Sequence, residues 1–374
     1  MVESVFIIGA TGKIGSELAR QIISSGDTDS RRHRNPTRIV GVASSSGFLY
    51  DASGISDSDV LAFSTKRTRG REHAGLGSLF DFLGGIEKPV RIVDVTASPE
   101  MLWFHKRIIS ETCHSIVTAN KLPLVLNSFD DFQLLTASHG RYAYSCSVMA
   151  GAEAVSFMRD IPDLGESFVE ITGSFSGTLG YVSSELGRGS LLSEAVRKAL
   201  EKGYTEPNPS IDLSGKDLAY KILTLARTAG MRVDLEEIKL TPFVPDEYLS
   251  YGDPELLLGR LGELDSAFAS RIALLKGNGK ALRYVARLSC AEKGGVPSVT
   301  VGLEELEVIH PLAQLQGTAN MIIIRAGPYG VNGNLPYIIE APGAGIDITA
   351  RNIRRDLLSQ IEDRHSAPPE QPQP

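Results

Sequence analysis

The sequence predicts an α/β protein built from two domains, the first of which contains a parallel sheet. The chain has 374 residues, which is more than one hydrophobic core usually supports. From Val5 to about Ala143, short apolar runs alternate with helical patterns, and such alternation produces right-handed crossovers between parallel strands. From about Tyr144 onward, longer helices are mixed with β-rich runs, which predicts an α+β domain. We therefore expect a first domain at 1–143, a second at 144–342, and a helix at about 343–362 that packs back on the first.

The first domain is expected to contain parallel strands joined by helices. The predicted strands are Val5 to Ile8, Ile39 to Ala43, Val90 to Val95 and Ser115 to Thr118. Ile14, Leu18 and Ile22 recur at every fourth position and share one face, which indicates a helix after the first strand. Another helix is expected to begin at Ser98-Pro99, because serine is a good N-cap and proline suits the first helical position.

The second domain is expected to mix both kinds of element. Its predicted strands include Phe168 to Ile171, Leu282 to Leu288, Met321 to Arg325 and Pro336 to Ile339. A helix is expected from Leu192 to Lys202, where Gly203 ends it. Helical periodicity returns from Thr349 to Ile361 and indicates the C-terminal helix. The tail at 366–374 is rich in proline and polar residues, so we expect it to be disordered.

Composition and charge exclude several classes of function. Apolar residues make up 42% of the chain and no apolar run is long enough to cross a bilayer, so we expect a soluble protein. The net charge of −7 argues against a general affinity for nucleic acid or anionic membranes. The N-terminus, MVESVFIIG, has no features of a signal or transit peptide, so we expect a cytoplasmic location. Cys113, Cys146 and Cys290 lack metal-ligand spacing and are expected to be reduced thiols.

A glycine-rich turn, GATGKIG, follows the first predicted strand. Its glycines lie between an apolar strand and an amphipathic helix, which is the context that a dinucleotide-binding turn requires. Glycine lets the backbone approach a pyrophosphate, whose charge is stabilised by free amides and the positive end of the helix. The sequence therefore predicts a Rossmann-type nucleotide-binding domain. The residues expected at the phosphates are Gly9, Ala10, Thr11, Gly12, Lys13, Ile14 and Gly15.

The end of the second predicted strand favours NADP over NAD. Domains that bind NAD usually carry an acidic residue there, which holds the ribose hydroxyls. This chain has Ala43-Ser44-Ser45-Ser46 instead, which favours NADP, and Ser44 is expected among the cofactor-binding residues. A basic residue between Lys66 and Arg71 is a candidate to bind the 2′-phosphate of NADP, and the alternative is that this run is only a solvated loop. The glycine spacing, GxxGxxG rather than GxGxxG, does not decide between the cofactors.

A segment rich in acids and lysine, Tyr204 to Lys221, carries the most specific chemistry. A proline-stiffened loop leads into a helix for which Ser214 is the expected N-cap and Gly230 the expected stop. The helix places Asp217, Lys221 and Thr224 on one stripe, so the acid and the lysine face the same way.

Taken alone, Asp217 and Lys221 are also typical of an exposed helix pair. The acids Glu206 and Asp212 lie just upstream, however, and concentrate three carboxylates around one ammonium. A small zwitterionic substrate needs carboxylates for its amino group and a proton-exchanging lysine at its hydroxyl.

The run GYTEPNPSIDLSGKDLAYKILTLAR closely resembles the signature of the homoserine dehydrogenases. In that signature, tyrosine-threonine-glutamate-proline is followed by aspartate-leucine-x-glycine-x-aspartate and then lysine. The resemblance covers nearly the whole chain except the tail. It includes VDVTAS at Val93 to Ser98, TANK at Thr118 to Lys121, SGTLGY at Ser176 to Tyr181 and APGAGIDITA at Ala341 to Ala350.

The resemblance implies the reversible, nicotinamide-dependent reduction of aspartate 4-semialdehyde to homoserine, a step of threonine and methionine biosynthesis. It implies that Lys121 and Lys221 flank the reacting carbon, one or both of them handling the proton, and that Lys121 also borders the cofactor. The substrate-binding residues that it implies are Gly177, Thr178, Tyr204, Glu206, Asp212 and Asp217. The residues that it implies at the nicotinamide end of the cofactor are Thr96, Ala97, Ser98, Gly343 and Gly345.

The chain departs from the family pattern just before the second domain. Many members have an acidic residue and then Val-Gly-x-Gly there, and backbone carbonyls hold a monovalent cation. Here Ser145 replaces the acid, Met149 the first glycine and Glu153 a nearby proline. Losing a carboxylate weakens an oxygen-ligand site. A Na⁺ or K⁺ site, if retained, is expected at the carbonyls of Val148, Ala150 and Ala152.

The resemblance further implies a homodimer built through the second domain. It begins at residue 5 and ends before the tail, so we expect a monofunctional enzyme without a kinase or regulatory domain. Two alternatives remain open. One is a related NADP-dependent dehydrogenase of another small amino-acid aldehyde, suggested by Met149 and Glu153. The other is a catalytically silent nucleotide-binding sensor.

Overall fold

The computed structural model of the chain describes residues 2–33, 36–138, 140–251, 253–290 and 297–366. The chain forms two compact units, of which the first comprises Met1–Gly151 with Gly345–Pro374 and the second comprises Ala152–Ala344. The tail predicted to be disordered, 366–374, lies outside the described residues from residue 367 on. Among the described residues, no helix is long and apolar enough to span a membrane.

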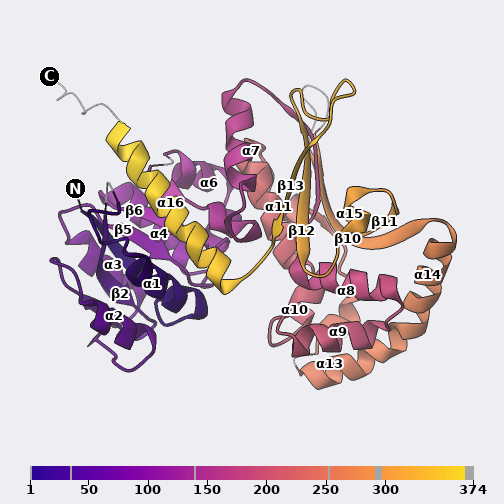
Figure 1. The fold of residues 1–374 in the computed structure, drawn as a ribbon, viewed down its shortest axis with the longest axis horizontal. Coiled ribbons are helices and arrows are strands. Elements are labelled where there is room, and N and C mark those ends of the chain that lie inside the picture. Colours follow the sequence, from indigo (N-terminus) through magenta and orange to yellow (C-terminus); the bar gives the residue numbers. More distant parts are fainter. Residues whose placement is uncertain (1, 34–35, 139, 252, 291–296, 367–374) are drawn as a thin grey trace. The chain divides into compact units, whose positions relative to one another are not determined.

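The first unit is a helix-covered sheet whose strands are mostly parallel (Figure 1). The strands are β1 (Glu3–Ile8), β2 (Thr37–Ala43), β3 (Gly47–Tyr50), β4 (Arg71–Glu72), β5 (Arg91–Asp94), β6 (Ser115–Thr118) and β7 (Tyr142–Ala143), in the order β4-β3-β2-β1-β5-β6-β7. The helices are α1 (Lys13–Ser25), α2 (Asp57–Ser64), α3 (Leu76–Gly84), α4 (Met101–Glu111), α5 (Leu122–Val125), α6 (Phe129–Thr136) and α16 (Ile346–Ser366). Two short 3₁₀ turns, η1 (Ser145–Ser147) and η2 (Met149–Gly151), close the unit.

The central strands are apolar on both faces because helices cover both sides of the sheet. Val5, Phe6 and Ile7 of β1 are fully buried, and Leu18 and Ile22 of α1 pack into the same core. Each of the four strands predicted for this region is present, as β1, β2, β5 and β6. The apolar periodicity after the first strand corresponds to α1, so the parallel α/β fold predicted from this alternation is confirmed.

Helix α16 belongs to the first unit although it comes last in the chain, and it lies beside α1 (Figure 1). Ile353 and Leu357, which lie within the stretch of predicted helical periodicity, are buried in the core of the unit. The guanidinium of Arg354 pairs with the carboxylate of Asp27, with Nη2 2.6 Å from Oδ1. Both apolar burial and a partly buried ion pair therefore hold α16 on this unit.

Two expectations for this unit need correction. The sheet is not wholly parallel, because a short turn after β2 returns the chain antiparallel as β3, which β4 then joins. Helix α4 begins at Met101 rather than at Pro99. The Oγ of Ser98 accepts the N–H of Glu100, and the carbonyl of Ser98 accepts the N–H of Met101, so a tighter turn precedes the helix.

The units divide after Gly151, whereas the sequence placed the boundary after Ala143. The turns η1 and η2 lie between those two positions and pack against α16. The buried carboxylate of Asp356 accepts the N–H of Ser145 at 3.0 Å. This contact attaches the turns to the first unit. Because Asp356 is far from Ser145 in the sequence, local patterns did not indicate it.

The second unit contains a mixed sheet with helices packed against it (Figure 1). Its strands are β8 (Phe168–Ser174), β9 (Lys239–Leu240), β10 (Lys280–Ser289), β11 (Ser298–Glu307), β12 (Ala319–Ala326) and β13 (Tyr337–Pro342), in the order β13-β12-β8-β10-β11-β9. Its helices are α7 (Ala154–Asp163), α8 (Gly177–Arg188), α9 (Leu192–Glu201), α10 (Ser210–Leu213), α11 (Lys216–Thr228), α12 (Asp246–Leu249), α13 (Pro254–Leu261), α14 (Asp265–Gly277) and α15 (Pro311–Gln314), with 3₁₀ turns η3 (Leu235–Glu237) and η4 (Gly262–Leu264).

Helices α8, α11, α14 and α15 contact strand β10, which is central to this sheet. The four strands predicted here are present as β8, β10, β12 and β13, and the helix predicted from Leu192 is α9. One local prediction was wrong: the N-cap of α11 is Gly215, not Ser214. Gly215 has a φ of +72°, and a Cβ there would lie 1.9 Å from the hydroxyl of Tyr284, so both space and backbone geometry require glycine.

Candidate active site

The glycine-rich turn between β1 and α1 is held by backbone contacts. The amides of Gly9 and Ala10 both donate to the carbonyl of Ala43 at the end of β2, each at 3.0 Å. A Cβ added at Gly15 would lie 2.2 Å from the carbonyl oxygen of Gly9, so α1 packs directly against the turn. Gly9 itself has a φ of +87°. The first and third glycines of the turn are therefore needed for its shape.

The N-terminus of α1 follows immediately and offers unpaired amides. In any α-helix the amides of the first turn have no acceptor within the helix. Here those amides belong to Lys13, Ile14 and Gly15, and Gly12 at the N-cap has no side chain to fill the space in front of them. Backbone donors and the positive end of the helix dipole attract an anion. The arrangement fits the pyrophosphate of a dinucleotide.

The end of β2 presents hydroxyl and cationic groups. The Oγ of Ser44 accepts the N–H of Gly47, 3.2 Å away, across the turn to β3. The imidazole Nε2 of His73 lies 3.0 Å from the carbonyl of Ser44, while its Nδ1 accepts the N–H of Gly75. Strand β4 pairs with β3 next to this turn, and Arg69 to Arg71 are exposed there. The fold thus brings the basic run beside the Ser44 turn.

The end of β5 carries a buried acid that organises the loop after it. Asp94 is fully buried, and its Oδ1 accepts the N–H of Thr96 at 2.8 Å. The Nε2 of His105 on α4 lies 3.2 Å from Oδ2 of Asp94, and its Nδ1 lies 2.8 Å from the hydroxyl of Tyr142. Burial raises the pKa of Tyr142 well above its usual value, so this tyrosine stays protonated. The carboxylate of Asp94, the imidazole of His105 and the phenol of Tyr142 therefore form one chain of contacts that holds the Thr96 loop.

Asn120 links that loop to the segment that carries Lys121. Its Nδ2 donates to the carbonyl of Ser98 at 3.0 Å, and its Oδ1 accepts the N–H of Leu122 at 3.1 Å. Lys121 is half-buried at the N-cap of α5. Thr96 and Ser98, which the resemblance assigned to the nicotinamide end, thus share one hydrogen-bonded cluster with Asn120 and Asp94. Ala97 and Lys121 are neighbours in the chain of these residues.

Lys221 is the central cation of the acid-and-lysine segment. It lies on α11 with only 9% of its surface exposed. Its Nζ is 2.9 Å from Oδ2 of Asp217 and donates to the carbonyl of Phe175 at 3.0 Å. An ammonium has three N–H donors. Two contacts among the described residues therefore hold Lys221 in place and leave one N–H for another oxygen.

Asp212 is a partly buried acid of this segment that other groups hold in place. Its Oδ1 accepts the hydroxyl of Thr178 and its Oδ2 accepts the N–H of Glu206, both at 2.9 Å. Burial raises the pKa of Asp212, these two hydrogen bonds oppose the shift, and the charges of Glu206 and Asp217 add to it. The carbonyl of Tyr204 is a second acceptor within reach of the Thr178 hydroxyl, so its single O–H is shared between this carbonyl and Asp212. The fold thus joins the predicted substrate residues Thr178, Tyr204, Glu206, Asp212 and Asp217, while Gly177 begins α8 beside Thr178.

Gly343 and Gly345 lie on either side of the point where the chain returns to the first unit. A Cβ at Gly343 would lie 1.5 Å from Nδ2 of Asn320, so this glycine is required by close packing. Asn320 is fully buried, and neither polar atom of its side-chain amide has a hydrogen-bond partner among the described residues. Sequence reasoning missed Asn320, because an isolated asparagine in a strand carries no functional signal.

The loop proposed to hold a monovalent cation is already engaged with protein donors. The carbonyls of Val148, Ala150 and Ala152 accept N–H groups from Gly151, Asn352 and Ala154, in that order. The guanidinium of Arg355 donates to the carbonyl of Gly151 next to them. The guanidinium of Arg355 thus already places a positive charge at this loop, and the nearby carboxylate of Asp356 accepts the N–H of Ser145. These residues do not fit a cation, and we assign no step to one.

Comparison with known proteins identifies the family. Residues 158–358 match the sequence profile of the family described as homoserine dehydrogenase. The chain belongs to this family. It is 31% identical to a chloroplastic bifunctional aspartokinase/homoserine dehydrogenase of Arabidopsis thaliana, over 95% of this chain and 38% of the relative. It is 29% identical to the homoserine dehydrogenase of Schizosaccharomyces pombe, over 95% of this chain and 94% of the relative.

The solved structures of the family agree with the fold. A hyperthermophilic archaeal homoserine dehydrogenase in complex with NADPH superposes with a TM-score of 0.71 at 20% identity, covering 97% of this chain and 98% of that chain. At this identity the likeness establishes the fold. The chain spans about two fifths of the length of the first curated relatives that it matches, which are bifunctional proteins.

Proposed function

We propose that the protein is an NADP-dependent homoserine dehydrogenase, which interconverts L-aspartate 4-semialdehyde and L-homoserine on the route to threonine and methionine. The observation that carries the proposal is the buried Lys221, oriented by Asp217 and by the carbonyl of Phe175. Family membership supports it, as does the similar fold of the archaeal homoserine dehydrogenase in complex with NADPH. The bound cofactor supplies hydride exchange at the carbinol carbon of the substrate.

Lys221 is proposed to exchange the proton of the reacting oxygen. In the direction of reduction, its remaining N–H donates to the aldehyde oxygen, which becomes the hydroxyl of homoserine. Asp217 and the Phe175 carbonyl hold the ammonium in one orientation, so little entropy is lost as the proton moves. We propose that Lys121 of the first unit takes part as well, on the cofactor side of the same reaction.

Glu206 and Asp212 are proposed to bind the ammonium group of the substrate. Glu206 is exposed, whereas Asp212 is partly buried and held by Thr178 and the Glu206 amide. Because burial and neighbouring acids raise the pKa of Asp212, an incoming ammonium relieves both penalties when it binds there. Gly177, Thr178 and Tyr204 would line this part of the substrate site.

The preference for NADP is supported by the end of β2. The chain has Ala43 and Ser44 where a ribose-binding carboxylate stands in NAD enzymes, and exposed arginines lie beside the turn. A carboxylate at this position would repel the 2′-phosphate, whereas hydroxyl and guanidinium groups bind phosphate well. The cofactor itself would lie with its pyrophosphate at Gly9 to Gly15 and its nicotinamide near the Thr96 to Ser98 loop.

The decisive experiment measures homoserine oxidation by the purified chain with NADP⁺ and with NAD⁺. Lys221→Met should lower kcat at least about 10²-fold, because a positioned acid-base group contributes about that much. Lys216→Met is the matched control, since Lys216 is exposed on the same helix and should leave kcat within about twofold. Faster turnover of another amino alcohol would support the sister dehydrogenase instead, and unchanged kcat in Lys221→Met would contradict this role for the lysine.

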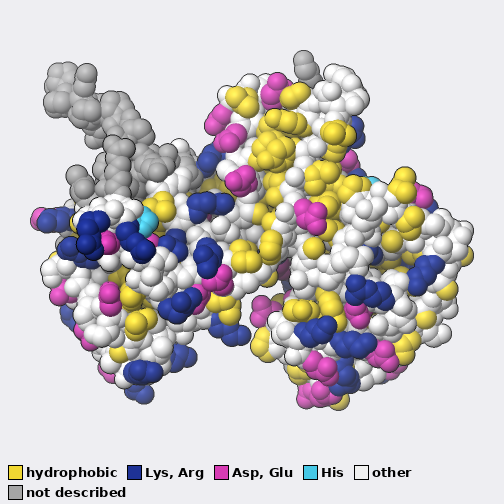
Figure 2. Space-filling model, in the orientation of Figure 1, with side chains coloured by type: hydrophobic (Ala, Val, Ile, Leu, Met, Phe, Trp, Pro, Cys, Tyr) yellow, Lys and Arg dark blue, Asp and Glu magenta, His cyan; other side chains and the backbone are white. Residues whose placement is uncertain are grey.

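We also propose that the enzyme acts in the cytoplasm as a homodimer formed through the second unit. Strand β13 is an edge of its sheet, and Ile338 on that strand is 43% exposed. Figure 2 shows hydrophobic side chains gathered on the surface over α7 and β13. An exposed edge with apolar neighbours is suited to pairing with a second copy. Light scattering coupled to size exclusion should give twice the chain mass, and Ile338→Lys should shift it toward the monomer.

A further inference from the structure

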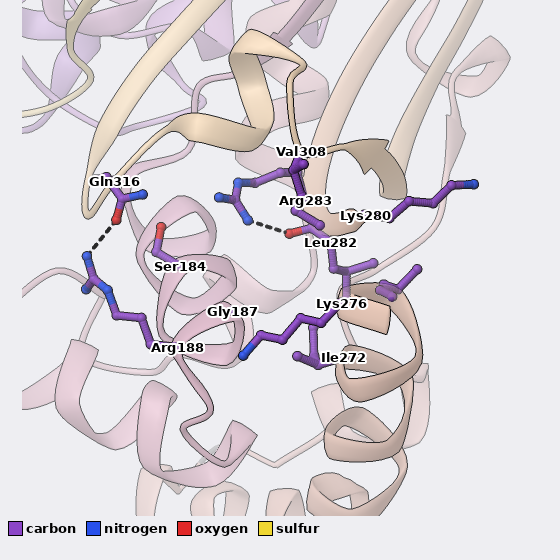
Figure 3. A pocket seen from close by; sticks show the side chains of 12 residues that line it. Ser184, Gly187, Arg188, Ile272, Lys276, Lys280, Leu282, Arg283, Val308 and Gln316 are labelled. Carbon is purple, nitrogen blue, oxygen red and sulfur yellow. Dashed lines mark hydrogen bonds between the residues drawn. The ribbon is translucent and has the colours of Figure 1, made fainter. Parts of the chain in front are cut away.

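A cavity of about 210 Å³ lies inside the second unit, away from the acid-and-lysine segment. Figure 3 shows it between the C-terminal half of α8, helix α14 and strand β10. Ile272, Leu275 and Leu282 form an apolar wall, and each of them is nearly fully buried. A small organic molecule fits such a cavity better than a hydrated inorganic ion does.

The charged residues that line this cavity are all cations: Arg188, Lys276, Lys280 and Arg283. Arg188 is neutralised by Glu185, with Nη1 2.7 Å from Oε1, and it also donates to the side chain of Gln316. Lys280 lies 3.9 Å from Glu307 and extends away from the cavity in Figure 3. Arg283 and Lys276, in contrast, have no carboxylate partner among the described residues.

Arg283 is a buried charge with no carboxylate counter-ion in the part of the chain that the structure describes. It is 5% exposed, and its guanidinium donates to the backbone carbonyls of Leu282, Leu312, Ala313 and Leu315. These bonds use four of its five N–H donors. Burial lowers the pKa of Arg283, and no acid contributes in the opposite direction. An unneutralised buried cation is costly, and an anion in the cavity would reduce that cost.

Lys276 supplies a second positive group. It lies in the last turn of α14 and extends toward Gly187 on α8 (Figure 3). Because Lys276 is exposed, its ammonium is free to move onto a ligand without breaking an ion pair within the described residues. One fixed cation and one mobile cation therefore stand beside an apolar wall.

We propose that this cavity is a second ligand site, which binds a small monocarboxylate with a branched apolar body. The carboxylate lies between Arg283 and Lys276, and the apolar body packs on Ile272, Leu275 and Leu282. A doubly charged inorganic anion lacks any group that would replace water on that wall. A cationic amine is repelled by the same residues.

The cavity is connected to the candidate substrate site by one rigid element. Helix α8 begins with Gly177 and Thr178, which belong to the substrate site, and ends with Gly187 and Arg188 at the cavity. Its 12 residues span about 18 Å. A ligand in the cavity therefore acts at a distance from the reacting atoms, and its binding is measurable whether or not the proposed dehydrogenase activity is correct.

Isothermal titration of the full chain with 3-methylbutanoate tests the proposal. Saturable binding is expected with a Kd of about 1 mM or tighter, as small ligands of this size achieve. The uncharged 3-methylbutan-1-ol and inorganic phosphate should each bind at least about tenfold more weakly. The alcohol lacks the carboxylate, and phosphate lacks the apolar body. Equal binding of phosphate, or of the alcohol, would overturn the assigned ligand class.

Variants separate the cavity from other anion-binding surfaces, including the glycine-rich turn. Lys276→Met should weaken 3-methylbutanoate binding about tenfold, as expected for loss of one charge-assisted hydrogen bond. Lys280→Met, the matched control on the cavity rim, should leave the Kd within about twofold. Lys276 is exposed and its replacement should not disturb folding, unlike replacement of the buried Arg283. Absence of saturable binding, or equal binding by Lys276→Met, overturns the site.

Discussion

The glycine-rich turn of the first unit and the acid-and-lysine segment of the second unit are built in opposite ways. The turn offers backbone amides, and its shape depends on Gly15, where a Cβ would collide with the Gly9 carbonyl, and on Gly9, whose φ is positive. The segment offers side-chain charges, of which Lys221 is held by Asp217 and Asp212 by Thr178 and the Glu206 amide. The turn therefore depends on glycines that have no side chain, whereas the segment depends on the charged groups of its side chains.

This difference predicts different consequences of substitution. At the turn, a small apolar addition is harmful because it displaces backbone, whereas loss of a side-chain charge matters little. In the segment, the same charge loss removes the chemistry while the fold stays intact.

Gly15→Ala should weaken NADPH binding about 100-fold, because the new Cβ would lie 2.2 Å from the carbonyl oxygen of Gly9. The turn or α1 must shift, and the first-turn amides move with it. Gly77→Ala is the control, since α3 has open space at that glycine. Fluorescence titration with NADPH measures both. If Gly15→Ala bound NADPH like the wild type, the turn would not be the pyrophosphate site.

The two regions also differ in how far the sequence alone predicts them. The glycine turn is local, so a strand, a glycine run and an amphipathic helix in order were enough to predict it. Asp217 and Lys221 are likewise one helical turn apart, and their contact follows from α-helix geometry. Local patterns therefore predicted the parts of each site that lie within one element.

The supporting groups come from elsewhere in the chain and could not be predicted. Phe175, whose carbonyl binds Lys221, lies after β8, and nothing in its residue type marks that role. His105 reaches Asp94, and Tyr142 reaches His105, only because α4 packs against β6 and β7 pairs with β6 in the folded unit. The burial that raises the pKa of Asp212 is also a property of the fold. Long-range packing set these features.

The double variant Arg69→Ala/Arg71→Ala tests the part of the cofactor site that is proposed to bind the 2′-phosphate. Recognition of the 2′-phosphate depends on side-chain charge, so kcat/KM for NADPH should fall about tenfold while the value for NADH changes little. Because the arginines are exposed to solvent, their charged hydrogen bonds to the phosphate should contribute less binding energy than buried ones would. Arg31→Ala, at a basic residue paired with Asp29, is the control. Equal losses with both cofactors would assign these arginines another role.

Asp217→Asn tests whether the carboxylate that orients Lys221 contributes to kcat. The amide keeps the shape but loses the charge that attracts Lys221, so kcat should fall about fivefold while KM for homoserine changes less. The pair is partly exposed on the Asp217 side, which limits the effect. Steady-state kinetics with homoserine measures both constants. An unchanged kcat would contradict direct coupling of the two side chains.

A third region, where α16 meets η1, uses both a backbone amide and a side-chain carboxylate. Substitution there is expected to have the smallest effect on activity. Buried Asp356 accepts the backbone N–H of Ser145, and burial raises its pKa to about 6, while that hydrogen bond and Arg355 oppose the shift. The nearby thiol of Cys146 is also buried, its pKa is raised well above its usual value, and it stays protonated. The folded state thus retains a proton on Asp356 at pH values where the unfolded chain has released it.

Between about pH 4 and pH 6, the free energy of unfolding should therefore fall as pH rises, and the loss should be complete above the folded pKa. Asp356→Asn keeps an oxygen acceptor for the Ser145 amide but needs no proton. At pH 7.5 it should stabilise the protein by about 3 kcal/mol, and its Tm should vary less with pH across that interval. Denaturant unfolding at several pH values measures both. Lower stability at neutral pH would mean that the Asp356 charge contributes more through Arg355 than its burial costs.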